Sequence, residues 1–320
     1  MNHPKVLFVI LVISFAFLSV FYSCSAQQQQ KGFSMYPEIT NRDKFFVDPL
    51  IFYEVDSLKA RLDLYIEVPN DNIIFKKDIN DEKYKSNISL IINIKNSVNE
   101  NILTKTYNEY SAYNDKEMIK KSKESRYFFY NYFVEPGNYK IDIIIKDNNS
   151  KGEFKKSADL SVKDFNAQEI SFSNLMILSK YKINEDGTKE ITPLINNNIF
   201  GLKEFFVFFE IYNKNNDDIT KEYIYKLKDN KDNIVKEDDL TYKLSPNKNQ
   251  NVENIFLLKE LKKYLPEEPD FDFFLYDNDQ NIFFKIEIID KSNNDLVATK
   301  KLAFVPKRLI SEMHKKPPMR

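Results

Sequence analysis

One pattern dominates the chain from about residue 45 onward: apolar and polar residues alternate. In the segment 60–68, four apolar side chains fall on one face of an extended strand: Leu62, Leu64, Ile66 and Val68. Arg61, Asp63 and Glu67 fall on the opposite face, because successive side chains of a strand alternate. The segments 88–94 and 139–145 repeat the pattern, and polar turn clusters separate them. We therefore expect an all-β protein of the β-sandwich type.

Two segments depart from this alternation and predict short helices. They are Asn114–Ser125 and Ile255–Leu265, and Pro266 would end the second.

An internal repeat indicates how the strands are grouped. Residues 139–149 align without a gap on residues 284–294, and a Lys-Lys pair follows each copy. Each copy resembles the closing hairpin of a sandwich, and Pro136–Tyr139 supplies the turn that leads into the first. We predict two tandem immunoglobulin-like β-sandwiches, at residues 45–166 and 167–306. Residues 27–44 would be a linker, and residues 307–320 a basic tail.

Two aromatic runs stand out within the predicted strands. Phe205–Phe209 is continuously apolar, which predicts a strand covered on both faces, in a core or where the two sandwiches meet. An exposed patch for a partner is the alternative. In the run Tyr127–Phe133, one face would carry Phe129, Asn131 and Phe133, and the other Tyr130 and Tyr132. We expect a packed strand there, with a tyrosine-lined, sugar-binding face as the alternative.

Residues 1–26 have the layout of a secretory signal: one Lys, an apolar run from Val6 to Tyr22, and then small residues. Cleavage after Ala26 would leave a chain that begins at Gln27. Alternatively, Cys24 follows the apolar run as the lipidated cysteine of a bacterial lipoprotein does, and it is the only cysteine in the chain. An uncleaved anchor is the third possibility, since the run approaches the length of a membrane span. We predict lipidation at Cys24.

Composition excludes several function classes. The chain has 47 Lys+Arg against 48 Asp+Glu, so it lacks the excess of basic residues that binds nucleic acid. One Cys and two His exclude disulfides within the chain and most metal sites and catalytic triads, and the five glycines form no phosphate-binding loop. We therefore assign no catalytic, cofactor-binding or metal-binding residues, and we expect no cofactor and no enzyme.

Two polar segments carry weaker alternatives. Asp277–Asn281 begins like a calcium loop, but Ile282 replaces the required Gly. We expect a plain turn, with a calcium-binding sandwich loop as the alternative. The carboxylates of residues 267–272 are expected to lie in a solvated loop.

The alternating segment 60–69, followed by Phe75-Lys76, and the turn 136–139 resemble the amino-terminal part of the GWxTD-domain family of exported bacterial proteins. Ile191-Thr192-Pro193 and the later segment 208–213 extend the resemblance over roughly residues 45–305. The chain has no Trp, so it lacks the Gly-Trp-x-Thr-Asp element itself. The resemblance implies an exported β-sandwich protein of the envelope and transfers no catalytic residues.

These observations predict a non-enzymatic interaction or scaffold protein of the cell envelope. It would be exported to the periplasm, outer membrane or cell surface, held at a membrane by lipid or anchor, and bound to another envelope protein. A surface carbohydrate-binding or adhesive module is the alternative.

Overall fold

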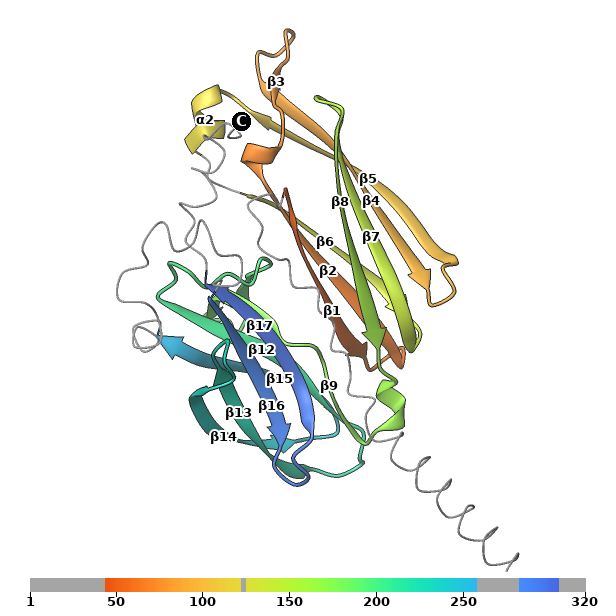
Figure 1. Cartoon of the computed structure of the whole chain (residues 1–320), viewed down its shortest axis with the longest axis vertical. Helices are drawn as coiled ribbons and strands as arrows, with labels where there is room; N and C mark the ends of the chain where they lie inside the picture. Colours follow the sequence, from red (N-terminus) through yellow and green to blue (C-terminus); the bar gives the residue numbers. More distant parts are fainter. Residues whose placement is uncertain (1–43, 122–124, 258–281, 305–320) are drawn as a thin grey trace, which may run out of the picture. The chain divides into compact units, whose positions relative to one another are not determined.

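The computed structural model describes residues 44–121, 125–257 and 282–304. Over these residues the protein is built almost entirely of β-strands, which form four antiparallel sheets (Figure 1). The described residues belong to one compact unit. The predicted all-β, sandwich-type fold is confirmed. No helix in the described ranges is long and apolar enough to cross a membrane.

Residues 46–162 form sheets A and B. Sheet A has the order β1-β2-β6, with the bounds β1 (Phe46–Glu54), β2 (Lys59–Pro69) and β6 (Ser125–Val134). Sheet B has the order β5-β4-β7-β8, with β3 beside the start of β4. Its strands are β3 (Lys76–Lys77), β4 (Tyr84–Asn96), β5 (Asn101–Tyr113), β7 (Gly137–Asp147) and β8 (Gly152–Val162).

Residues 170–304 form sheets C and D. Sheet C contains β9 (Ile170–Phe172), β10 (Met176–Ile183), β11 (Lys189–Pro193), β12 (Glu204–Asn213) and β15 (Asn247–Leu257). Sheet D contains β13 (Ile219–Lys228), β14 (Ile234–Leu244), β16 (Ile282–Asp290) and β17 (Leu296–Phe304). The order β10-β12-β15 matches β1-β2-β6, and β14-β13-β16-β17 matches β5-β4-β7-β8. The two halves of the chain therefore share one strand order.

The internal repeat of the sequence coincides with this shared order. Its two copies lie in β7 and β16, and each pairs with the next strand as an antiparallel hairpin, as predicted. The predicted turn before β7 is also present: the Tyr139 hydroxyl donates a hydrogen bond of 2.7 Å to the Glu135 carbonyl, and Gly137 has φ +153°. This hydrogen bond is typical of the tyrosine corner of immunoglobulin-like sandwiches.

The alternating residues line the cores of both halves. The apolar face of β2 is buried, as are Ile88, Leu90 and Ile92 of β4 and the facing isoleucines of β7. In the second half, one cluster of buried side chains joins sheets C and D, and it includes Phe205, Val207 and Phe209.

One of the two predicted helices is present in the described residues. Of the described residues in the segment Asn114–Ser125, Lys116–Lys121 form α2, and the Asp115 carboxylate accepts a hydrogen bond of 2.7 Å from the Met118 N–H. The second predicted helix is wrong at its start, because residues 255–257 belong to β15, and the remainder lies outside the described residues. Two 3₁₀ turns are present, η1 (Asn70–Asn72) and η2 (Phe165–Ala167).

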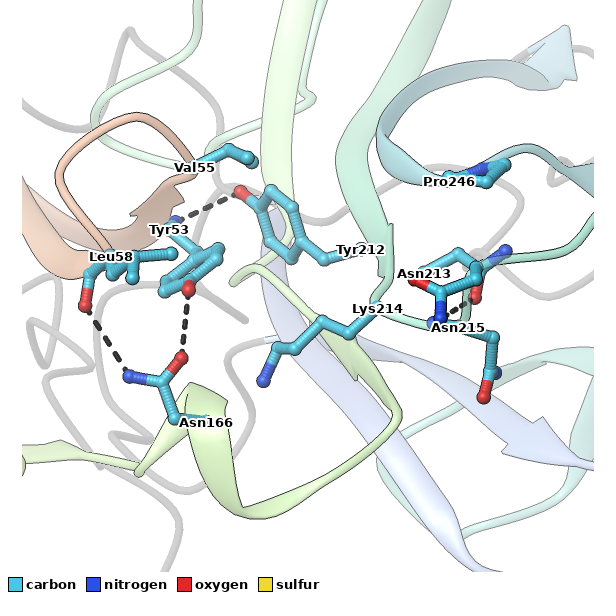
Figure 2. A pocket seen from close by; sticks show the side chains of 10 residues that line it. Tyr53, Val55, Leu58, Asn166, Tyr212, Asn213, Lys214, Asn215 and Pro246 are labelled. Atoms are coloured by element: carbon cyan, nitrogen blue, oxygen red, sulfur yellow. Dashed lines mark hydrogen bonds between the residues drawn. The ribbon is translucent and has the colours of Figure 1, made fainter.

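The outer faces of sheets A and C meet, and we call this contact the joint. Its apolar centre consists of Leu50, Phe52, Met176, Leu178 and Phe208. The Tyr53 N–H donates a hydrogen bond of 2.9 Å to the Tyr212 hydroxyl (Figure 2), and Lys300 pairs with Asp48 at 2.5 Å. Since Phe208 is buried in the joint and Phe209 in the core, the prediction that Phe205–Phe209 is covered on both faces is confirmed.

Candidate interaction surface

The most exposed aromatic side chains of sheet A lie together on β6. Tyr127, Phe129 and Phe133 are 62%, 49% and 57% exposed, respectively. They occupy alternate positions of one strand, so they share its outer face. We call these three side chains the β6 strip. The sequence predicted that Phe129 and Phe133 share a face, but it favoured a packed strand, and on this face that expectation is wrong.

The opposite face of β6 carries Tyr130 and Tyr132, and it packs against sheet B. The Tyr130 ring stacks on Tyr107 at 4.0 Å between centroids, and its hydroxyl donates a hydrogen bond of 2.9 Å to Glu109. The Tyr132 hydroxyl lies 3.0 Å from that of Tyr107. Burial and the Glu109 carboxylate raise the pKa of Tyr130. Tyr130 and Tyr132 therefore connect the two sheets, so the expected packed strand is confirmed on this face and the tyrosine-lined outer face is not formed.

The backbone of β6 is a sheet edge. Within the described part of the chain, β6 pairs with β2 alone, in continuous register over its full length. Its sequence contains no proline and a single charged residue, Arg126. The Arg126 guanidinium is turned inward, with a hydrogen bond of 3.1 Å to the Ser86 hydroxyl and a position 5.2 Å above the Phe128 ring. The strand thus lacks the outward charges, prolines and bulges that usually protect an edge.

The β6 strip continues into the joint. Phe129 lies beside Tyr65 of β2, with 4.8 Å between ring centroids. Tyr65 in turn packs on the apolar centre of the joint. One aromatic surface therefore runs from the covered part of sheet A to its exposed edge.

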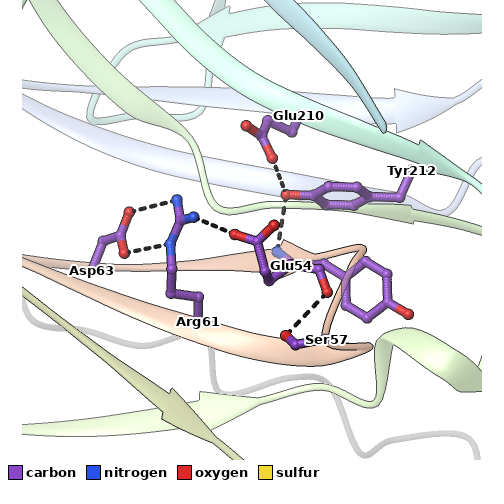
Figure 3. Close-up of polar contacts among 7 residues, drawn as sticks. Glu54, Ser57, Arg61, Asp63, Glu210 and Tyr212 are labelled. Carbon is purple, nitrogen blue, oxygen red and sulfur yellow. Dashed lines mark hydrogen bonds and ion pairs between the residues drawn. The ribbon is translucent and has the colours of Figure 1, made fainter. Parts of the chain in front are cut away.

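Two polar residues of β2 that point away from the core, Arg61 and Asp63, form ion pairs. Arg61 contacts Asp63 at 2.8 Å and Glu54 at 2.7 Å, and Figure 3 shows the guanidinium between the two carboxylates. Burial opposes the charge of Arg61, but both carboxylates favour it and raise its pKa. The Tyr212 hydroxyl donates a hydrogen bond to Glu210 close by (Figure 3). Asp63 is therefore buried rather than solvated, because the joint covers this face.

The remaining site predictions lie outside the described residues. These are Cys24, the calcium-like segment 277–281, the carboxylates of residues 267–272 and the tail 307–320. In the described ranges, no group of three or more His, Cys, Asp or Glu side chains is placed to hold a metal ion.

Comparison with known proteins gives little further guidance. No protein-family model and no curated protein matches the sequence, so the GWxTD resemblance stays a prediction. Among solved structures, red sea bream transglutaminase aligns with 82% of this chain and 31% of its own length, at 6% identity and a TM-score of 0.23. A calcium-binding mutant of Bacteroides uniformis beta-glucuronidase 2 aligns with 79% of this chain and 27% of its own length, at 10% identity and a TM-score of 0.26. The chain spans about a third of these structures or less, and similarity at this level supports no functional argument.

Proposed function

We propose that this chain is an exported, non-enzymatic interaction protein of the cell envelope that binds a partner protein along β6. The observation that carries the proposal is an edge strand whose outer face exposes three aromatic side chains. Export and a lipid at Cys24 are inferred from the leader sequence and agree with the GWxTD resemblance.

The physical basis of binding is strand addition. An extended segment of the partner would pair with the open edge of β6 through backbone hydrogen bonds, which supply affinity without regard to sequence. Specificity would come from apolar side chains at alternate positions of that segment, because they would lie beside Phe129 and Phe133. Since β6 carries little charge, the partner segment needs no strongly charged residues.

The exposed side chains favour a protein partner over a glycan. Sugar recognition combines an aromatic platform with several hydrogen-bonding groups, but Asn131 is the only amide among the outward residues of β6. The tyrosines that could have formed a sugar-binding face are packed against sheet B instead.

Site-specific photocross-linking in intact cells tests this proposal. A photoreactive residue at Asn131, in the middle of the β6 strip, is expected to give one recurrent protein adduct. Thr106 is the matched control, because it is exposed on the neighbouring edge strand β5. Equal adducts from both positions, or none from Asn131, would contradict a binding site on β6.

A further inference from the structure

A cavity that shares no residue with the β6 strip lies at the end of β1, across β2 from β6. Its volume is about 280 Å³, just below the range of about 300–1,000 Å³ that is usual for ligand pockets. The end of β1, the loop before β2, η2 and the loop after β12 all contribute to its wall. Figure 2 shows the rings of Tyr53 and Tyr212 beside the amine of Lys214.

Among the described residues, the Lys214 amine forms no hydrogen bond and no ion pair. Its nitrogen is buried and lies 5.3 Å from the centroid of the Tyr53 ring. By contrast, Lys300 is paired with Asp48 and Lys228 with Glu287. A buried ammonium without an acceptor is costly, because it has lost its hydration without replacement. A carboxylate that reached this nitrogen would replace the hydration that the ammonium has lost.

The side chains of Asn166 and Asn213, two other polar groups of the wall, already form hydrogen bonds within the protein. The Asn166 amide accepts from the Tyr53 hydroxyl at 2.7 Å and donates to the Leu58 carbonyl at 3.3 Å. Asn213 donates to two backbone carbonyls at 3.0 Å each. Lys214 is thus the cationic group left to meet a ligand.

Asp164 is the acid whose charge acts on Lys214, but no ion pair joins the two described side chains. The Asp164 carboxylate accepts the Asn166 N–H at 2.8 Å. Burial lowers the pKa of Lys214, and Asp164 opposes that shift. Lys163, the residue before Asp164, lies over the Phe165 ring at 5.2 Å and does not line the cavity.

We propose that this cavity binds the carboxylate of a small organic acid, with Lys214 as its charged anchor. The rings of Tyr53 and Tyr212 would flank the carbon skeleton of the ligand. The size of the cavity suits a single sugar acid or a molecule of similar bulk. This site is independent of the β6 strip, so either can fail without the other.

Titration of the full chain with glucuronate, followed by the NMR signals of the tyrosine rings, tests the proposal. Glucose is the matched neutral probe, since it has the same ring without the carboxylate. We expect saturable shifts with glucuronate and none with glucose at equal concentration. Lys214→Met should weaken binding by about tenfold or more, the scale of a lost charge-assisted hydrogen bond, and Lys163→Met should weaken it much less.

Two outcomes would overturn the proposal. One is equal binding of glucose and glucuronate, or no saturable shift with either. The other is a folded Lys214→Met variant that keeps the affinity of the natural chain.

The affinity for glucuronate should also fall as the pH rises through the pKa of Lys214, because the neutral amine no longer attracts a carboxylate.

Discussion

The Tyr212 hydroxyl connects the two sheets of the joint, and its removal should lower the free energy of unfolding. The side chain is fully buried. Its oxygen accepts the Tyr53 N–H at 2.9 Å and donates to the Glu210 carboxylate, so it bridges β1 and β12. Tyr212→Phe keeps the ring and removes this bridge.

Two lost hydrogen bonds should lower the free energy of unfolding of Tyr212→Phe. A buried N–H left without an acceptor costs about 1–3 kcal/mol, and a hydrogen bond to a charged group is worth about 1.5–3 kcal/mol. Since both involve one atom, they will not add fully, and we expect a loss of about 3 kcal/mol. For a unit of this size, this corresponds to a fall in Tm of roughly 6–12 °C.

Differential scanning calorimetry measures this change directly. Tyr110→Phe is the matched control. Because Tyr110 is 70% exposed, the Tm of this variant should equal that of the natural chain. If Tyr212→Phe melted with the natural chain, the bridge between sheets A and C would not be part of the folded protein, and the description of the joint would be wrong.

Three further predictions concern other parts of the chain. Burial raises the pKa of Glu287, but Lys228 at 2.6 Å and Lys285 at 2.9 Å outweigh it and hold that pKa below 4.5, so the stability it contributes is lost as pH falls through the lowered value. Acid unfolding followed by circular dichroism should therefore be less steep in Glu287→Gln, and an identical slope would contradict the ion pairs. Gly137→Ala should cost about 1–3 kcal/mol in urea unfolding, because φ +153° is unfavourable for a residue with a Cβ; no loss would exclude this turn. Cys24→Ser should move the protein from the membrane to the soluble fraction of its native cells, and an unchanged distribution would reject lipidation.

The sequence predicted the elements with a local signature. Period-two alternation located the buried face of β2, and the repeat located the hairpins that contain β7 and β16. The alternation depends on neighbouring residues, and the repeat on a direct comparison of two segments, so neither signal requires knowledge of which sheets pack together.

Other features depend on which sheet covers which, and alternation cannot reveal that. Asp63 was expected opposite the core, but sheet C covers that face and Arg61 pairs with it. Phe129 belongs to the same sheet face and yet is half exposed, because it lies at the edge. Lys214 has no sequence signal at all, since its cavity is assembled from four separate segments.

Binding of a partner protein by the β6 strip is tested most directly by the substitution Phe133→Lys. Phe133→Lys places a charge on an exposed position of the strip and should leave the Tm nearly unchanged. Affinity purification from native cells after cross-linking should recover the partner with the natural chain and with the control Tyr110→Lys, but not with Phe133→Lys. Recovery of the same partner in equal amount with Phe133→Lys would contradict the claim.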